Sequence, residues 1–246
     1  MDIKPPFGYK AVVPLNRTQK IRLLKPGETP EFARGLNAIP ISYTEFAIVV
    51  REYPIVFAAI GGNNQFAPVA VLGMVQGENL YDQKGKWAPN VYVPAYARRF
   101  PFCMTKVTLD KVEQRDRLIC VEKSYIDEKA GESLFDAKGQ PIPKWKEIEG
   151  LLTQFEIDLE RSREMCGILA DYGLLEPFTM QAKLAKGGSP MAMTGMHRVA
   201  ETKIEHLNAA QLKNLVKKGI LSRVYTHLLS LDNFAKLLDR KATKAA

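Results

Sequence analysis

The sequence has no apolar run long enough to cross a membrane. A membrane-spanning helix needs about 20 predominantly apolar residues, and the longest apolar stretches, 47–50 and 54–60, are separated by Arg51, Glu52 and Tyr53. The stretch 1–20 carries an early charge but lacks the apolar core and the cleavage site of a signal peptide. We therefore expect a cytoplasmic protein without a transmembrane segment. Export by a route that needs no N-terminal signal stays open.

Cysteine is scarce, with three residues in a chain of 246. Cys103, Cys120 and Cys166 are odd in number, and none of them lies in a C-x-x-C motif. The sequence therefore predicts neither a disulfide framework nor a cysteine-based metal or redox site. We interpret all three cysteines as small buried side chains.

The familiar signatures of catalysis are also missing. The histidines His197, His206 and His227 lie in no H-E-x-x-H or H-x-D motif, and there is no G-x-S-x-G elbow, P-loop or G-x-G-x-x-G loop. The sequence thus predicts no catalytic residue, no metal ligand and no cofactor. Two carboxylates far apart in sequence could still form a glycosidase pair. We expect His227, which lies among apolar helical positions, to be packed and hydrogen-bonded.

Positive charge is concentrated at one end of the chain. The formal net charge is +8, and the segment from Met180 onward holds 12 Lys and Arg against four acidic residues, while the remainder has 23 of each sign. A basic end can favour nucleic acid, anionic lipid or an acidic partner. It can equally be the solvated face of a helix, which is the interpretation we prefer. Nucleic-acid binding is the weakest of the partner hypotheses.

The pattern of apolar residues predicts an α+β fold. Residues 1–140 read as mainly β, with a hairpin at 54–75 and two further strands at 103–109 and 117–123. Residues 141–246 read as mainly helical. We expect an antiparallel β-sheet in the N-terminal half with the helical C-terminal half packed on it, in a single domain that spans 1–246. The expected helices are 145–173, 209–219 with Asn208 as N-cap, and 220–241, and a flexible hinge is expected at 185–195.

Two loops share a local pattern. Residues 79–87 and 133–145 both contain Leu, an aromatic residue and Asp-x-Lys-Gly, followed by a tryptophan. Asp-x-Lys-Gly favours a tight turn with the glycine at a positive φ. We interpret the loops as similar turns. The alternatives are a duplicated ligand loop or a calcium loop, although each turn has too few carboxylates for the six to eight oxygen ligands that calcium takes.

The most unusual segment is 87–102, in which aromatic side chains and proline surround two arginines. Aromatic residues beside arginine are typical of sugar, peptide and nucleic-acid recognition. Proline-spaced aromatics can also form a structural plug over a sheet, and both interpretations stay open. The candidate ligand-binding residues in this segment are Trp87, Tyr92, Tyr96, Arg98 and Arg99.

The order of several motifs resembles the SapC family of bacterial proteins. The resemblance rests on YPIVF at 53–57, LGMVQGENLYDQKGKW at 72–87 and YVPAYARRFPF at 92–102, and it continues to the end of 215–238. This resemblance implies an association with bacterial surface layers and supplies no catalytic residue. A transporter permease carries the same name, but it would need several membrane spans, which this sequence lacks.

We therefore expect a non-enzymatic binding or accessory protein associated with the bacterial cell surface or envelope, with a protein or a cell-surface glycan as partner. The first alternative is an enzyme, or the partner subunit of an enzyme, that acts on a protein side chain or a surface glycan. The second is nucleic-acid binding through the basic C-terminal quarter. The sequence does not define the oligomeric state.

Overall fold

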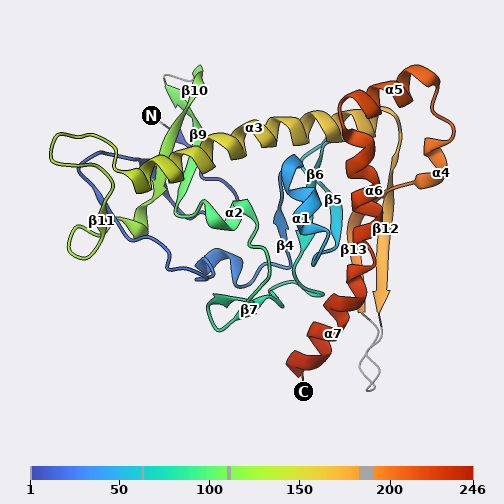
Figure 1. Cartoon of the computed structure of the whole chain (residues 1–246), viewed down its shortest axis with the longest axis horizontal. Coiled ribbons are helices and arrows are strands. Elements are labelled where there is room, and N and C mark those ends of the chain that lie inside the picture. Colours follow the sequence, from blue (N-terminus) through green and yellow to red (C-terminus); the bar gives the residue numbers. More distant parts are fainter. Residues whose placement is uncertain (1, 63, 110–111, 183–190, 246) are drawn as a thin grey trace.

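The computed structural model describes residues 2–62, 64–109, 112–182 and 191–245. The strands expected for one sheet are divided between two larger sheets, and the long helix α3 (Pro143–Asp171) runs past both of them (Figure 1). Antiparallel sheets dominate the N-terminal half and helices the C-terminal half, so the predicted α+β class is confirmed. In the part of the chain that the structure describes, no helix is long and apolar enough to cross a membrane.

The first sheet has four antiparallel strands in the order β1-β9-β10-β2. Its central pair comprises the two strands predicted at 103–109 and 117–123, and Cys103 lies opposite Cys120 in the register. Both thiols are buried and free, as is that of Cys166, which confirms the interpretation of the cysteines. The strands are β1 (Asp2–Ile3), β2 (Val12–Pro14), β9 (Phe102–Leu109) and β10 (Val112–Glu122). Short pairs join β3 (Lys20–Ile21) to β11 (Glu132–Ser133) and β7 (Asp82–Gln83) to β8 (Lys86–Trp87).

The second sheet has five antiparallel strands in the order β12-β13-β5-β6-β4. The predicted hairpin forms β5 and β6. A second antiparallel pair, β12 and β13, adds two strands from the C-terminal half, for which the sequence predicts mainly helix. The flexible hinge expected at 185–195 is wrong for 191–195, which belong to β13, and its remaining residues lie outside the described ones. The strands are β4 (Ala38–Pro40), β5 (Ile55–Ala59), β6 (Phe66–Val71), β12 (Leu175–Ala182) and β13 (Met191–Val199).

The helices begin and end at residues that the sequence marks. Pro143 occupies the first turn of α3, where its missing N–H costs nothing, and Gly173 follows the helix with φ +65°. The expected single helix at 220–241 is wrong, because it breaks at 231–232 into two. The other helices are α1 (Phe46–Val49), α2 (Ala95–Arg98), α4 (Glu201–Ile204), α5 (Ala209–Lys217), α6 (Ile220–Ser230) and α7 (Asn233–Ala245), with 3-10 turns η1 (Glu31–Ala33), η2 (Tyr43–Glu45) and η3 (Lys123–Tyr125).

Asn208 caps α5 as predicted. Its side chain accepts a hydrogen bond from the N–H of Gln211 at 2.9 Å, and Gln211 Oε1 accepts one from the N–H of Asn208 at 3.0 Å. We expect Asn208→Ala to lower the free energy of unfolding by about 1 kcal/mol, because it removes one side of this capping box. Urea unfolding of both proteins checks this value. An unchanged midpoint would mean that α5 frays without cost to the rest of the fold.

His227 joins α6 to the second sheet. Its Nε2 accepts a hydrogen bond from the N–H of Val199 at 3.1 Å, and its Nδ1 lies 2.7 Å from the carbonyl oxygen of Ile55. Because Nε2 is the acceptor, Nδ1 must carry the proton and donate to Ile55. The ring is fully buried, so the prediction of a packed, hydrogen-bonded histidine is confirmed.

Candidate functional site

Trp87 and Tyr92 take part in a hydrogen-bonded chain beside the core. The indole Nε1 of Trp87 donates to the hydroxyl of Tyr53 at 2.9 Å, and that hydroxyl donates to the carbonyl oxygen of Tyr92 at 2.6 Å. Trp87 and Tyr53 are buried. These contacts hold the segment 87–92 against the helical turn that precedes β5, which is what a structural plug does.

Glu45 is the centre of the next part of the segment. Its Oε1 accepts hydrogen bonds from the N–H of Ala95 at 2.7 Å and the hydroxyl of Tyr92 at 3.0 Å, and its Oε2 accepts from Ser42. Burial, together with the nearby charge of Glu45, raises the pKa of Tyr92 to about 12 despite the opposing charge of Arg98. Tyr92 is therefore a neutral hydrogen-bond donor throughout the physiological pH range.

The neighbouring arginines of the segment have opposite environments. Arg98 is exposed, and it donates to the carbonyl oxygen of Val93 and to the hydroxyl of Tyr92. Arg99 is 3% exposed. Its guanidinium lies 4.1 Å from the ring centre of Tyr96 and 4.6 Å from that of Phe155. Arg98 is the last residue of α2, and Arg99 is its C-cap with helical backbone angles. One helical step of about 100° separates the two residues, so one arginine is directed outward and the other inward.

Arg99 has an incomplete set of polar partners. Its Nη1 lies 3.5 Å from Glu156 Oε1 on α3, and Glu156 also pairs with Arg117 on β10. Within the described residues, the buried Nε of Arg99 has no hydrogen-bond partner. Burial raises the pKa of Glu156, and the charges of Arg117 and Arg99 only partly offset that rise. Two permanently charged guanidinium groups thus share the Glu156 carboxylate, and Arg117 has a second acidic partner in Glu160.

Arg99 and Tyr96 line a groove of about 620 Å³ between the N-terminal arm, the first sheet and α3. Glu156 is the single acidic residue among five basic ones on its walls, and Glu160, which is not among the lining residues, pairs with Arg117 and Arg163, so the groove keeps an excess of positive charge. Trp87, Tyr92 and Arg98 belong instead to the networks described above. The basic residues of the walls are Lys4, Arg99, Lys106, Arg117 and Arg163, and the apolar ones include Pro5, Pro6, Met104, Phe155 and Leu159.

Two of the groove residues, Tyr96 and Arg99, lie in the segment that the sequence marks as unusual, and the others lie outside it. Glu156 and Arg163 lie on one face of α3 with Phe155 and Leu159, at the three- and four-residue spacing of a helix. That spacing is the one local signal in the sequence that places these residues together, and in the sequence it predicts only an apolar stripe along the helix. Lys4 and Arg117 come from strands and arms far away in sequence, and no local pattern links them to Arg99.

The basic C-terminal quarter is partly neutralised inside the molecule. Several of its cations pair with acidic residues elsewhere in the chain, which supports a structural use of this charge. The ion pairs are Arg198 with Glu176, Lys218 with Glu164, Arg240 with Glu52, and Lys241 with Glu78.

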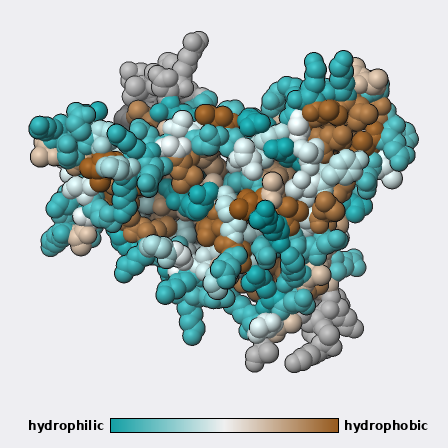
Figure 2. All heavy atoms as spheres, viewed as in Figure 1, coloured by the Kyte–Doolittle hydropathy of each residue, from teal (hydrophilic) through white to brown (hydrophobic). Residues whose placement is uncertain are grey.

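Figure 2 shows a hydrophobic patch over the region of α5 and α6, where Leu212, Val216 and Leu229 are exposed.

The fold and the groove define an α+β protein with a cationic recess between sheet and helix. A family model described as SapC matches residues 16–237, and the chain therefore belongs to the SapC family. Comparisons with curated proteins and with solved structures gave no match.

Proposed function

We propose that this protein is a non-enzymatic binding protein of the bacterial envelope, and that its groove receives an acidic group of a protein or glycan partner. The observation that carries the proposal is the buried Arg99, whose guanidinium is fixed between Tyr96 and Phe155 and shares its acidic partner with Arg117. A fixed guanidinium loses little side-chain freedom on binding, so its contact with a ligand contributes more affinity.

The chemistry of the groove suits recognition of a carboxylate, sulfate or phosphate. Arginine stays charged at all physiological pH values and binds such groups with two parallel hydrogen bonds. Aromatic and proline side chains on the walls offer apolar surface for the rest of a sugar or a peptide. The envelope as location rests on the SapC resemblance and its implied association with surface layers.

Charge reversal at the rim of the groove tests the proposal. We expect Lys4→Glu with Arg163→Glu to weaken co-sedimentation with isolated cell envelopes of the source bacterium at least tenfold, because a hydrogen bond to a charged group contributes about 1.5–3 kcal/mol. Polygalacturonate, which is rich in carboxylates, should compete with the wild-type protein, and neutral dextran should not.

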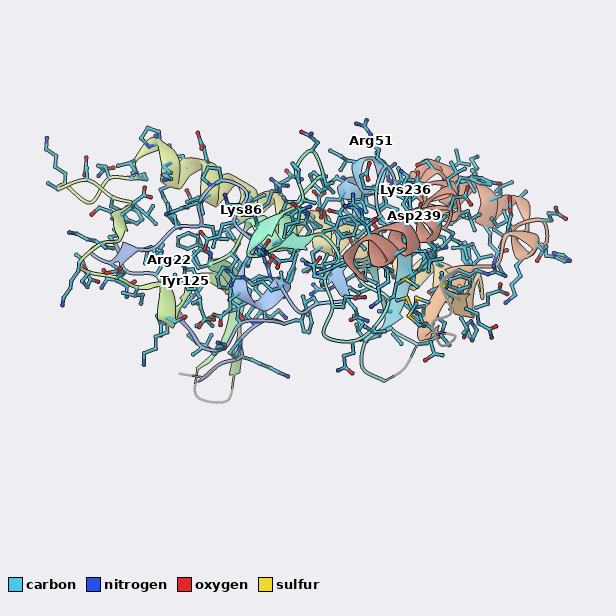
Figure 3. All side chains as sticks on the ribbon, turned by 90° about the horizontal axis from the view of Figure 1, so that it is seen from below. Arg22, Arg51, Lys86, Tyr125, Lys236 and Asp239 are labelled. Atoms are coloured by element: carbon cyan, nitrogen blue, oxygen red, sulfur yellow. The ribbon has the colours of Figure 1, made fainter. Side chains whose placement is uncertain are left out.

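The matched control is Arg51→Glu with Lys146→Glu, which changes the net charge equally at exposed positions outside the groove. Figure 3 shows Arg51 extending outward from the molecule. The control should keep wild-type sedimentation, and both variants should unfold at wild-type urea concentrations. Equal retention of the groove variant, or equal loss in the control, would remove the groove as the binding site.

A further inference from the structure

The two Asp-x-Lys-Gly loops form tight turns of the same chemistry. In the first, the N–H of Gly85 donates to Asp82 Oδ1 at 3.2 Å, with Lys84 at φ 54° and Gly85 at φ +87°. In the second, Asp136 Oδ1 accepts from two backbone N–H groups at 2.8 Å, and Gly139 has φ +72°. Both turns therefore need glycine at this position, and in both the Asp carboxylate serves the turn itself.

An arginine lies against the glycine of each turn. A Cβ atom added at Gly85 would lie 3.2 Å from Nη2 of Arg34, and one added at Gly139 would lie 3.9 Å from Cδ of Arg17. The first turn therefore brings a guanidinium close to its backbone. The two turns differ in their surroundings, and this difference makes the second turn a natural control for the first.

The first turn lines a hollow of about 300 Å³ in which positive charge is concentrated. Arg22 is held there by an ion pair of 2.6 Å with Glu28 and by the ring of Tyr125, 4.8 Å away. Figure 3 shows Arg22 beside Tyr125, with Lys86 on the neighbouring hairpin. The basic residues that line the hollow are Arg22, Lys25, Arg34, Lys84 and Lys86.

Glu28 is the single carboxylate on the walls of this hollow, and it is already engaged. Its burial acts to raise its pKa, but the hydrogen bond from the N–H of Lys25 and the charges of Arg22 and Arg34 outweigh burial and lower the pKa. Glu28 is thus ionised and neutralises one cation. In the described part of the chain, Lys25, Lys84 and Lys86 form no ion pair with an acidic group.

We infer that this hollow is a binding site for a phosphate or sulfate group, separate from the groove around Arg99. Four cations remain after the pairing of Arg22 with Glu28, and a compact dianion neutralises more of this charge than a carboxylate does. Lysines act as mobile point charges and Arg34 supplies directed donors. The volume suits the anionic group and a few attached atoms, while the remainder of the ligand stays in solvent.

Titration with inorganic phosphate and with sulfate tests the inference. At low ionic strength, we expect Lys84→Glu with Lys86→Glu to weaken binding of both ions at least tenfold, measured by calorimetry against sodium chloride of equal ionic strength. A neutralising variant, Lys84→Asn with Lys86→Gln, should weaken it in the same direction, since asparagine tolerates the positive φ of position 84. The matched control is Lys129→Glu with Lys138→Glu, two exposed positions outside the hollow of which Lys138 belongs to the second turn, and it should bind within twofold of wild type.

Three outcomes would overturn the inference. The first is unchanged binding in both hollow variants, and the second is an equal loss in the control, which would indicate general charge attraction. In the third, the groove variant Lys4→Glu with Arg163→Glu loses the ions while the hollow variants keep them. That result would move the ion to the groove and would leave the proposed function standing.

Two further arms distinguish the source of the anionic group. A hexose phosphate tests a soluble or glycan-linked phosphate, and vesicles of phosphatidylcholine with phosphatidylglycerol test a lipid headgroup. Because the hollow is concave and bounded by the β7–β8 hairpin, we expect the hexose phosphate to displace inorganic phosphate and the vesicles not to bind. Vesicle binding without displacement by hexose phosphate would overturn the choice of a soluble ligand.

Discussion

Arg99→Ala should lower the free energy of unfolding by about 3 kcal/mol. The side chain is buried against Tyr96, Phe155 and Tyr9, and its removal loses these cation–π contacts and leaves a void at the junction of α2 and α3. Glu156 keeps its pair with Arg117, which limits the cost of the lost charge. Urea unfolding monitored by tryptophan fluorescence measures the effect.

Arg98→Ala is the matched control for this prediction. Arg98 is exposed, and its hydrogen bonds to Val93 and Tyr92 lie in contact with solvent. We expect a loss below about 1 kcal/mol, as is usual for exposed polar contacts. If the two alanine variants were equally stable, Arg99 would not be packed as described, and the groove would lose its fixed guanidinium.

Acidification should destabilise the protein through His227. Burial lowers the pKa of this histidine to about 4 from an ordinary value of about 6.5; the hydrogen bond to Ile55 opposes this shift, and the charge of Arg198 adds to it. Above pH 6.5 the ring is neutral in both the folded and the unfolded state. Between pH 6.5 and 4 the unfolded chain takes up the proton and the folded protein does not. Stability present above pH 6.5 is therefore lost as the pH falls, by about 3 kcal/mol in total.

The contribution of His227 can be isolated with His227→Gln. This variant should be less stable than wild type at pH 7, because the hydrogen bonds to Ile55 and Val199 are disturbed. The difference between the two proteins should shrink towards pH 4, since the variant lacks the proton uptake. Urea unfolding at several pH values between 7 and 4 measures it. Parallel stability curves would show that the folded protein accommodates the charged imidazole.

Local patterns in the sequence determined much of the secondary structure. Helical spacing placed α3, and Asn208 correctly marked the start of α5. The turn residues between 60 and 67 correctly predicted the β5–β6 hairpin. These features depend on residues within a few positions of one another, so they can be read without knowledge of the fold. The β12–β13 pair was not predicted, because both strands carry mixed polar and apolar residues and because β13 joins the sheet only by pairing with β5.

The candidate sites likewise combine features that local sequence patterns predict with features that only tertiary packing determines. The sequence singled out the segment 87–102 and the two Asp-x-Lys-Gly turns, because aromatic, arginine and glycine residues gather there locally. It could not decide which of two adjacent arginines would be buried, since both fit the helical backbone at the end of α2 equally well. Phe155, which lies far along the chain, decides that choice by packing against Arg99. Likewise, Arg22 and Arg34 reach the first turn only because the β7–β8 hairpin folds back onto 22–34. Charge that is dispersed in the sequence becomes a site only when long-range packing brings it together.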